Sequence, residues 1–247
     1  MRKTTFRAGF AAVAAAAMLL AGCGSNDSTG STGTGDSAAV QSDADNGVAA
    51  LGAEEILAKA KEALTKAGSY KMSGSATQDG TTMKMDFEIS GKDLKGKLTM
   101  GEGADIELLS VGGQQFMKPS EGFWTMLGLG AQAKTMTDKL GGKWVLVPTT
   151  DQSLSGIFGA ANPDEVLKPT GTLTKGAATE VAGTPVITLT DSGDAETSMF
   201  VATKGEPYPV KLGAATGDGV TFSDFGASFT DIKAPAEGEF VKKEDLA

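Results

Sequence analysis

Few residues in this chain of 247 could act in catalysis or bind a metal, because it has no histidine and a single cysteine, Cys23. The absence of histidine excludes the Ser-His-Asp triad, Cys-His pairs and most zinc sites. No serine is followed three residues later by lysine, the spacing of serine/lysine acyl enzymes. The sequence therefore predicts a protein that is not an enzyme and that has no metal site and no cofactor.

Two further motifs have a chemical and a structural interpretation. Asp86 and Glu88 could serve glycoside hydrolysis only beside a sugar-stacking cleft, and two tryptophans and two tyrosines supply little of one. We expect these carboxylates on the solvated face of a strand. Gly128–Ala133 matches the G-x-G-x-x-A dinucleotide pattern, but no βαβ unit surrounds it. We interpret it as a turn before a helix.

Cys23 directly follows Leu20-Ala21-Gly22, after basic residues near the start and an apolar run from Ala8 to Leu20. This order is typical of a secretory signal. The position of the lone cysteine resembles the lipobox of bacterial lipoproteins, in which the thiol is acylated and becomes the mature N-terminus. The apolar run is shorter than the roughly 20 residues that span a bilayer. We expect residues 1–22 to be a lipoprotein signal peptide, Cys23 to be the lipidation site, and the folded part to lie on the extracytoplasmic face of the cell membrane.

Charge constrains the partners of the mature chain. Removal of the three basic residues that precede Cys23 takes the net charge from −9 to −12. An acidic protein is repelled by nucleic acid and by anionic lipid surfaces. We therefore expect no nucleic-acid partner, and attachment to the membrane through the acyl chains of the N-terminus.

Composition divides the remaining chain into two parts. Residues 24–52 are almost entirely Gly, Ser, Thr, Ala, Asp, Asn and Val, which bury too little apolar surface to fold. We expect 23–52 to be an acylated cysteine and a flexible tether, and 53–247 to be a single domain whose charged tail from Ala234 frays.

Ala53–Ala67 has apolar residues at helical spacing and ends before Gly68, a C-cap residue type. Alternating apolar and polar residues bounded by glycine turns then predict an antiparallel meander. Its expected strands are Tyr70–Thr77, Met83–Ile89, Leu94–Met100, Ile106–Val111 and Gln114–Lys118, with Gly112-Gly113 as the last turn.

The middle of the chain interrupts this pattern with helices, which suggests a lid or a plug on one face of the sheet. Helices are expected over Ala131–Leu140, Asp151–Phe158 and Pro163–Leu167, and a strand over Lys143–Val147. Strands return at Thr179–Val181, Pro185–Thr190, Glu196–Ala202, Pro209–Leu212 and Val220–Phe225.

The apolar face of the sheet is rich in methionine, with eight outside the signal. Methionine is flexible and lines adaptable apolar surfaces, although it also fills ordinary cores. Two interpretations stay open here, a packed core and an internal hydrophobic pocket. The residues expected to line such a pocket are Met83, Met85, Phe87, Leu98, Met100, Phe116, Leu127 and Val145.

The chain resembles the LppX/LprAFG-type lipoproteins of actinobacteria, which are similar in fold to the LolA/LolB lipoprotein carriers. The resemblance rests on the lipobox and tether, on the helix leading into Tyr70–Gly74, and on three stretches near the C-terminus: Thr179–Val186, Gly205–Leu212 and Val220–Phe225. It implies an α+β fold, a strongly curved antiparallel β half-barrel with helices on its concave face, enclosing an apolar cavity for lipids or glycolipids.

The leading hypothesis is therefore a membrane-anchored envelope lipoprotein that binds, and carries outward, a lipid or glycolipid. The alternative is a half-barrel with a filled core that acts as an interaction or sensor module for another envelope protein. The first requires space between sheet and helices, whereas the second requires close packing there and a conspicuous patch on the outer surface.

Overall fold

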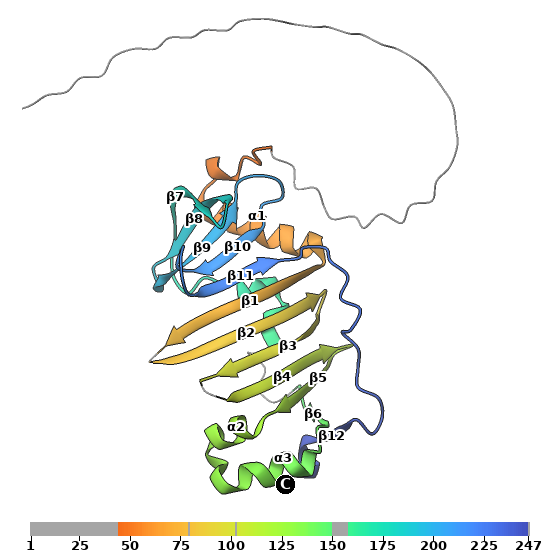
Figure 1. The fold of residues 1–247 in the computed structure, drawn as a ribbon. Helices are drawn as coiled ribbons and strands as arrows, with labels where there is room; N and C mark the ends of the chain where they lie inside the picture. The colour runs from red at the N-terminus through yellow and green to blue at the C-terminus, as the bar shows by residue number, and fades with distance from the viewer. Residues whose placement is uncertain (1–43, 79, 102, 150–157, 247) are drawn as a thin grey trace, which may run out of the picture. The chain divides into compact units, whose positions relative to one another are not determined.

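The computed structural model describes residues 44–78, 80–101, 103–149 and 158–246, which all belong to one compact unit (Figure 1). The signal peptide expected at 1–22, the lipidation site Cys23 and most of the tether lie outside the described residues. The helix expected over Asp151–Phe158 also lies outside them, apart from Phe158.

The described chain forms one open sheet of 12 strands, in the order β12-β6-β5-β4-β3-β2-β1-β11-β10-β9-β8-β7 (Figure 1). All neighbours are antiparallel except β12 and β6. Pairing of β1 with β11 joins the first meander to the second. The strands are β1 Ser69–Gln78, β2 Thr81–Ser90, β3 Asp93–Met100, β4 Ala104–Val111, β5 Gln114–Pro119, β6 Trp144–Val147, β7 Leu173–Val181, β8 Thr184–Asp191, β9 Asp194–Ala202, β10 Pro209–Gly213, β11 Gly219–Ser223 and β12 Phe240–Lys242.

The predicted turn between β4 and β5 shows why the sequence forms hairpins. Gly112 and Gly113 have φ of 58° and 80°, which are both left-handed. Two such residues make a turn whose twist matches that of the flanking strands. Because side chains alternate along β2 to β5, one face of this meander is apolar and the other is charged.

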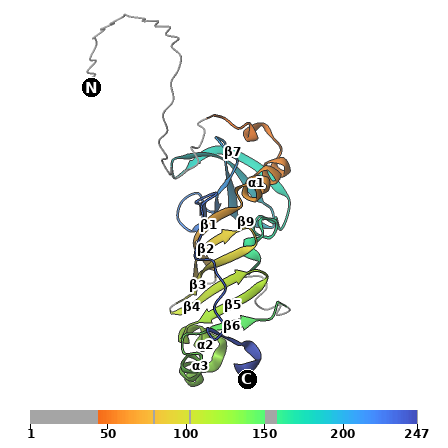
Figure 2. The same ribbon diagram turned by 90° about the vertical axis from the view of Figure 1, so that its right-hand side faces the viewer.

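Helix α1 (Ala53–Ala67) has the predicted bounds and ends at Gly68, whose φ is 72°. Glu55 Oε2 accepts a hydrogen bond from the Gly52 N–H at 3.0 Å and so caps the first turn. The helix contacts β1 and β7 (Figure 2). Its buried residues share one core with the apolar face of the sheet: Ile56, Leu57, Ala60 and Leu64.

The other helices are short. They are η1 Val48–Ala50, α2 Glu121–Trp124, η2 Thr125–Leu129, η3 Gly130–Gln132, α3 Ala133–Leu140, η4 Gly159–Ala161, α5 Pro163–Val166 and η5 Lys243–Leu246. Phe158, Ala161 and Val166 pack into the same core as α1, so η4 and α5 lie on the same face of the sheet. We call this face the concave face. The predicted fold class, α+β with a curved antiparallel half-barrel and helices on its concave face, is confirmed.

Two ends of the domain differ from the sequence-based expectation. Residues 44–52, assigned to the tether, pack on the domain: Val48 is buried, and Lys175 Nζ donates to the Leu51 carbonyl at 2.8 Å. At the other end, the tail expected to fray forms β12, and the Phe240 ring packs edge-on against Phe116 at 5.5 Å. A few apolar residues within a polar segment suffice to pack each end on the domain. The average composition of the segment does not reveal them.

Candidate ligand cavity

The concave face is built from rows of residues that pair across neighbouring strands. One row runs through Met72, Phe87, Gly96, Leu108 and Met117. The next contains Met85, which pairs with Leu98. Since residues of one row point to the same side of the sheet, an apolar floor extends from β1 to β5.

Part of this floor borders open space and is not covered by side chains from the described helices. A cavity of about 450 Å³ lies between the sheet and the η4–α5 segment, and we call it the apolar cavity. Its volume is within the range of about 300–1,000 Å³ that is typical of small-molecule sites. It is lined by Met72, Met83, Met85, Phe87 and Leu98 of the first meander, by Leu212 and Val220 of the second, and by Gly159, Glu165 and Val166.

Gly96 helps to shape the floor of the apolar cavity. A Cβ atom at this position would lie 2.2 Å from Phe87 Cδ1 and 2.2 Å from the Asp86 carbonyl oxygen. The Phe87 ring therefore occupies the space that a side chain on β3 would fill. A glycine where another group approaches closely is a common device in curved sheets.

A second cavity of about 670 Å³ lies toward the other end of the same strands, beside Phe158 and Pro163. We call it the Tyr70 cavity. Tyr70 and Gln115 line it, and among the described residues neither the Tyr70 hydroxyl nor Gln115 Oε1, both buried, has a hydrogen-bond partner. Burial raises the pKa of Tyr70 to about 12, so its hydroxyl stays neutral near pH 7.

The opposite face of the same strands is polar. Lys71 pairs with Asp86 at 3.2 Å and Lys97 with Asp105 at 2.8 Å. Hydrogen bonds from Lys97 and Thr99 lower the pKa of Asp105. The expectation that Asp86 lies on a solvated strand face is confirmed, since its side chain is 58% exposed.

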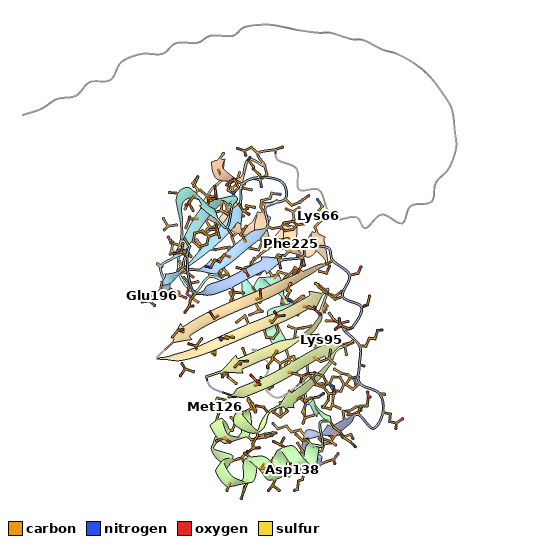
Figure 3. The ribbon with its side chains drawn as sticks, viewed as in Figure 1. Lys66, Lys95, Met126, Asp138, Glu196 and Phe225 are labelled. Carbon is orange, nitrogen blue, oxygen red and sulfur yellow. The ribbon has the colours of Figure 1, made fainter. Side chains whose placement is uncertain are left out.

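On this polar face, Lys95 also binds Asp231, which places the C-terminal segment alongside β3 (Figure 3). The hydrogen bond from Lys95 lowers the pKa of Asp231. Asp86, Lys95, Lys97 and Asp231 line a groove on this face, and their contacts are ion pairs between side chains exposed to solvent.

The eight residues expected to line a pocket are distributed over several places. Met83, Met85, Phe87 and Leu98 line the apolar cavity. Met100 packs against the edge of the core, and Val145 is fully buried within it.

Phe116 and Leu127 do not lie where the sequence placed them. Phe116 points to the opposite face, because it pairs with Leu109 while its neighbour Met117 pairs with Leu108 of the concave face. It packs there against Phe240. Leu127 is 57% exposed and lies with Met126 in the segment between α2 and α3, which Figure 3 shows at Met126. Gly128, which directly follows Leu127, has a left-handed φ of 86° and interrupts the helical conformation there.

Other lining residues were missed from the sequence. Met72 pairs directly with Phe87, so continuing the alternation across the first hairpin would have found it. Leu212 and Val220 come from strands more than 100 positions away, and only the pairing of β11 with β1 brings them to the cavity. The two unpartnered polar groups give no signal in the sequence.

The described residues lack two features that would bear on the class of site. They contain no cluster of three or more His, Cys, Asp or Glu side chains that could hold a metal ion. Among them, no helix combines the length and the apolar character needed to cross a bilayer.

No family model matches the sequence, and no curated protein is significantly similar to it. A chain of the Pseudomonas aeruginosa MucA/MucB complex has 19% identity and a TM-score of 0.34, over 75% of this chain and 62% of that one. A structure of MucB in complex with MucA(peri) has 17% identity and a TM-score of 0.33, over 75% and 59%. The chain thus spans about three-fifths of these structures. Likeness at this level carries no argument about function.

Proposed function

We propose that this protein is a membrane-anchored envelope lipoprotein that holds an acyl chain of a lipid or glycolipid in the apolar cavity and shields it from water during transfer. The observation that carries the proposal is the apolar cavity itself, with Met72, Met83 and Met85 in its floor. The resemblance to LppX/LprAFG-type lipoproteins supports the same function.

The physical driving force is the removal of methylene groups from water. A palmitoyl tail has about 14 methylenes, which at about 0.8 kcal/mol each contribute on the order of 11 kcal/mol when buried. Loss of translational and rotational freedom opposes this by at least about 4 kcal/mol. The difference is at most about 7 kcal/mol, which corresponds to a dissociation constant no lower than about 10 μM. Such an affinity allows a ligand to be taken up and released.

The membrane anchor rests on Cys23 and is tested separately. In cells fed labelled palmitate, the full chain should incorporate label and sediment with membranes. Cys23→Ala should abolish the label because the acylated thiol is gone. Equal labelling of both proteins would remove the lipoprotein part of the proposal and leave the cavity untouched.

The cavity is tested with the chain from Gly24 to Ala247, which keeps the whole compact unit. Native mass spectrometry after addition of palmitic acid should show one bound molecule. Val220 lines the cavity, whereas Thr221, its neighbour on β11, lies exposed on the other face. Val220→Trp should lower the bound fraction at least about tenfold because the indole occupies the cavity.

Thr221→Trp is the matched control and should bind palmitic acid like the parent chain. Absence of binding by the parent chain, together with absence of any co-purified lipid, would overturn the proposal. Equal binding by both tryptophan variants would place the acyl chain elsewhere.

A second candidate is an interaction module for another envelope protein, and a surface observation favours it. Met126 and Leu127 are 48% and 57% exposed and adjacent. A contiguous exposed apolar patch commonly marks a docking surface, and these two side chains could form the centre of one. A photo-crosslinking residue at Leu127 should then join the chain to one envelope protein, whereas the same residue at exposed Lys139 should not. Identical crosslinking patterns from both positions would remove this candidate.

A further inference from the structure

Toward one end of the strands, the concave face carries a row of paired residues that is partly polar. The row that contains Tyr70 continues through Ile89 and Leu94 to Ser110 and Gln115. It therefore carries three hydrogen-bonding side chains, whereas the next row, through Met72 and Phe87, carries none between β1 and β5. The apolar cavity opens over the apolar rows, and the Tyr70 cavity opens over the polar row. The concave face is thus amphipathic along its strands.

In the polar row Gln115 is half-buried as a residue, although its Oε1 atom is buried like the Tyr70 hydroxyl. Tyr70 is 2% exposed and Ser110 is 8% exposed. Within the described chain no protein atom hydrogen-bonds the Tyr70 hydroxyl or Gln115 Oε1. A buried polar group without a partner costs about 1–3 kcal/mol of stability, so two of them lining one cavity require an explanation beyond packing.

The two cavities share a wall. Gly159, Glu165 and Val166 of the η4–α5 segment line the apolar cavity, while Phe158 and Pro163 of the same segment line the Tyr70 cavity. One molecule with an apolar tail and a polar head could therefore contact both. We propose that the Tyr70 cavity is the headgroup subsite, and that it selects an uncharged headgroup with several hydroxyl groups. This inference rests on the function proposed above.

The chemistry of the lining favours hydroxyl groups. The neutral Tyr70 hydroxyl can donate and the Gln115 amide oxygen can accept, and a ligand hydroxyl does both. Neighbouring strands lie about 4.8 Å apart, so a row from β1 to β5 is about 19 Å long along the sheet. A sugar or other polyol has hydroxyls at several positions and can bond side chains on more than one strand of such a row, which a single alcohol cannot.

The charges of the lining disfavour an anionic headgroup. Lys92 is the one cation among the described lining residues, and it is exposed. Asp164 adds a negative charge at the rim, where it pairs with Lys61 at 3.1 Å. A phosphate placed against Tyr70 would be desolvated without a buried counter-charge. Selection of a neutral headgroup follows.

The test uses two probes that share one tail, dodecyl maltoside and dodecyl phosphate, below their micelle concentrations. Calorimetric titration of the chain from Gly24 to Ala247 should detect both. Tyr70→Phe and Gln115→Leu should each weaken dodecyl maltoside about five- to tenfold, the usual effect of losing one hydrogen bond. Neither substitution should change the affinity for dodecyl phosphate more than about twofold, because its head stays in water.

Tyr208→Phe is the matched control. Tyr208 is the other tyrosine of the chain, and its ring stacks on Phe225 at 3.9 Å. It should leave both affinities unchanged. If both probes bind and no variant affects dodecyl maltoside, the headgroup subsite is refuted and acyl binding stands. If the variants weaken dodecyl phosphate equally, the selection of neutral heads is refuted. If neither probe binds, the proposed function fails and the subsite fails with it.

Discussion

Residues that are adjacent in β2 and β3 lie on opposite faces of the sheet and have different contacts. Met85 and Leu98 line the apolar cavity, whereas Asp86 and Lys97, one position away, form ion pairs on the opposite face. The polar face is held by contacts between exposed charges, which contribute little to stability. The concave face buries most of the apolar side chains, and it also contains the apolar cavity. Alternation thus assigns residues to a face but does not decide how completely that face is filled.

The concave face itself differs from one side to the other. On β4 and β6, Ile106 and Val145 are fully buried in a packed core. On β2, Met83 and Met85 are only half-buried, beside the apolar cavity. The segment η4–α5 covers the sheet without filling the space above these methionines.

The largest expected effect contrasts the packed part of the concave face with the polar face. Ile106→Ala should lower the free energy of unfolding by about 3 kcal/mol, because it leaves a cavity in a close-packed core. Glu107→Ala, next to it on the exposed face, should change it by less than about 0.5 kcal/mol. Urea denaturation measures both. Similar losses in the two variants would contradict the assignment of the faces.

Gly96 tests the shape of the cavity floor. Gly96→Ala should cost about 2 kcal/mol, since the new Cβ meets the Phe87 ring and the Asp86 backbone. Gly159→Ala is the control, because its Cβ meets nothing within 4 Å. Thermal unfolding of the two variants should separate them by several degrees. If Gly96→Ala unfolds like the parent chain, Phe87 and the Asp86 backbone can move to accept the new Cβ atom, and the close packing at Gly96 does not limit the shape of the floor.

Tyr70 sharpens the contrast between the apolar rows and the polar row. Tyr70→Phe should raise the free energy of unfolding of the ligand-free chain by about 1 kcal/mol, because it removes a buried hydroxyl that has no partner. Tyr208→Phe should leave it nearly unchanged. Denaturant titration gives both values, and a loss of stability in Tyr70→Phe would mean that the hydroxyl is satisfied within the chain.

The smallest effect concerns the polar face. The pKa of Asp105 is lowered in the folded state, so the carboxylate stabilises the fold above its ordinary pKa of about 3.9. This contribution is lost as the pH falls through the lowered value. Asp105→Asn should therefore cost less than about 1 kcal/mol at pH 7, since the pair is partly exposed.

The difference between Asp105→Asn and the parent chain should disappear in strong acid. In a Lys97→Met background the same substitution should have a smaller effect, because Lys97 is the main cause of the shift. A constant difference across the pH range would assign the effect to packing.

The sequence predicted much of the fold because local rules governed it. Alternation placed Met83, Met85 and Phe87 on one face, and the turn at Gly112-Gly113 formed as expected. The same alternation was misapplied at Phe116, which is apolar but out of phase with Met117. Leu127 was misassigned because an apolar residue was taken to be buried, although the turn expected at Gly128 directly follows it.

The sequence by itself determined the helix, the meander, the apolar face and the absence of histidine from any possible site. These depend on residue type and on spacing within a few positions. Only the tertiary structure decided that β11 pairs with β1, that Leu212 and Val220 complete the apolar cavity, and that Tyr70 and Gln115 line one cavity without partners. Such features depend on long-range pairing and on how far the η4–α5 segment fills the space above the sheet, and no short stretch of sequence encodes either.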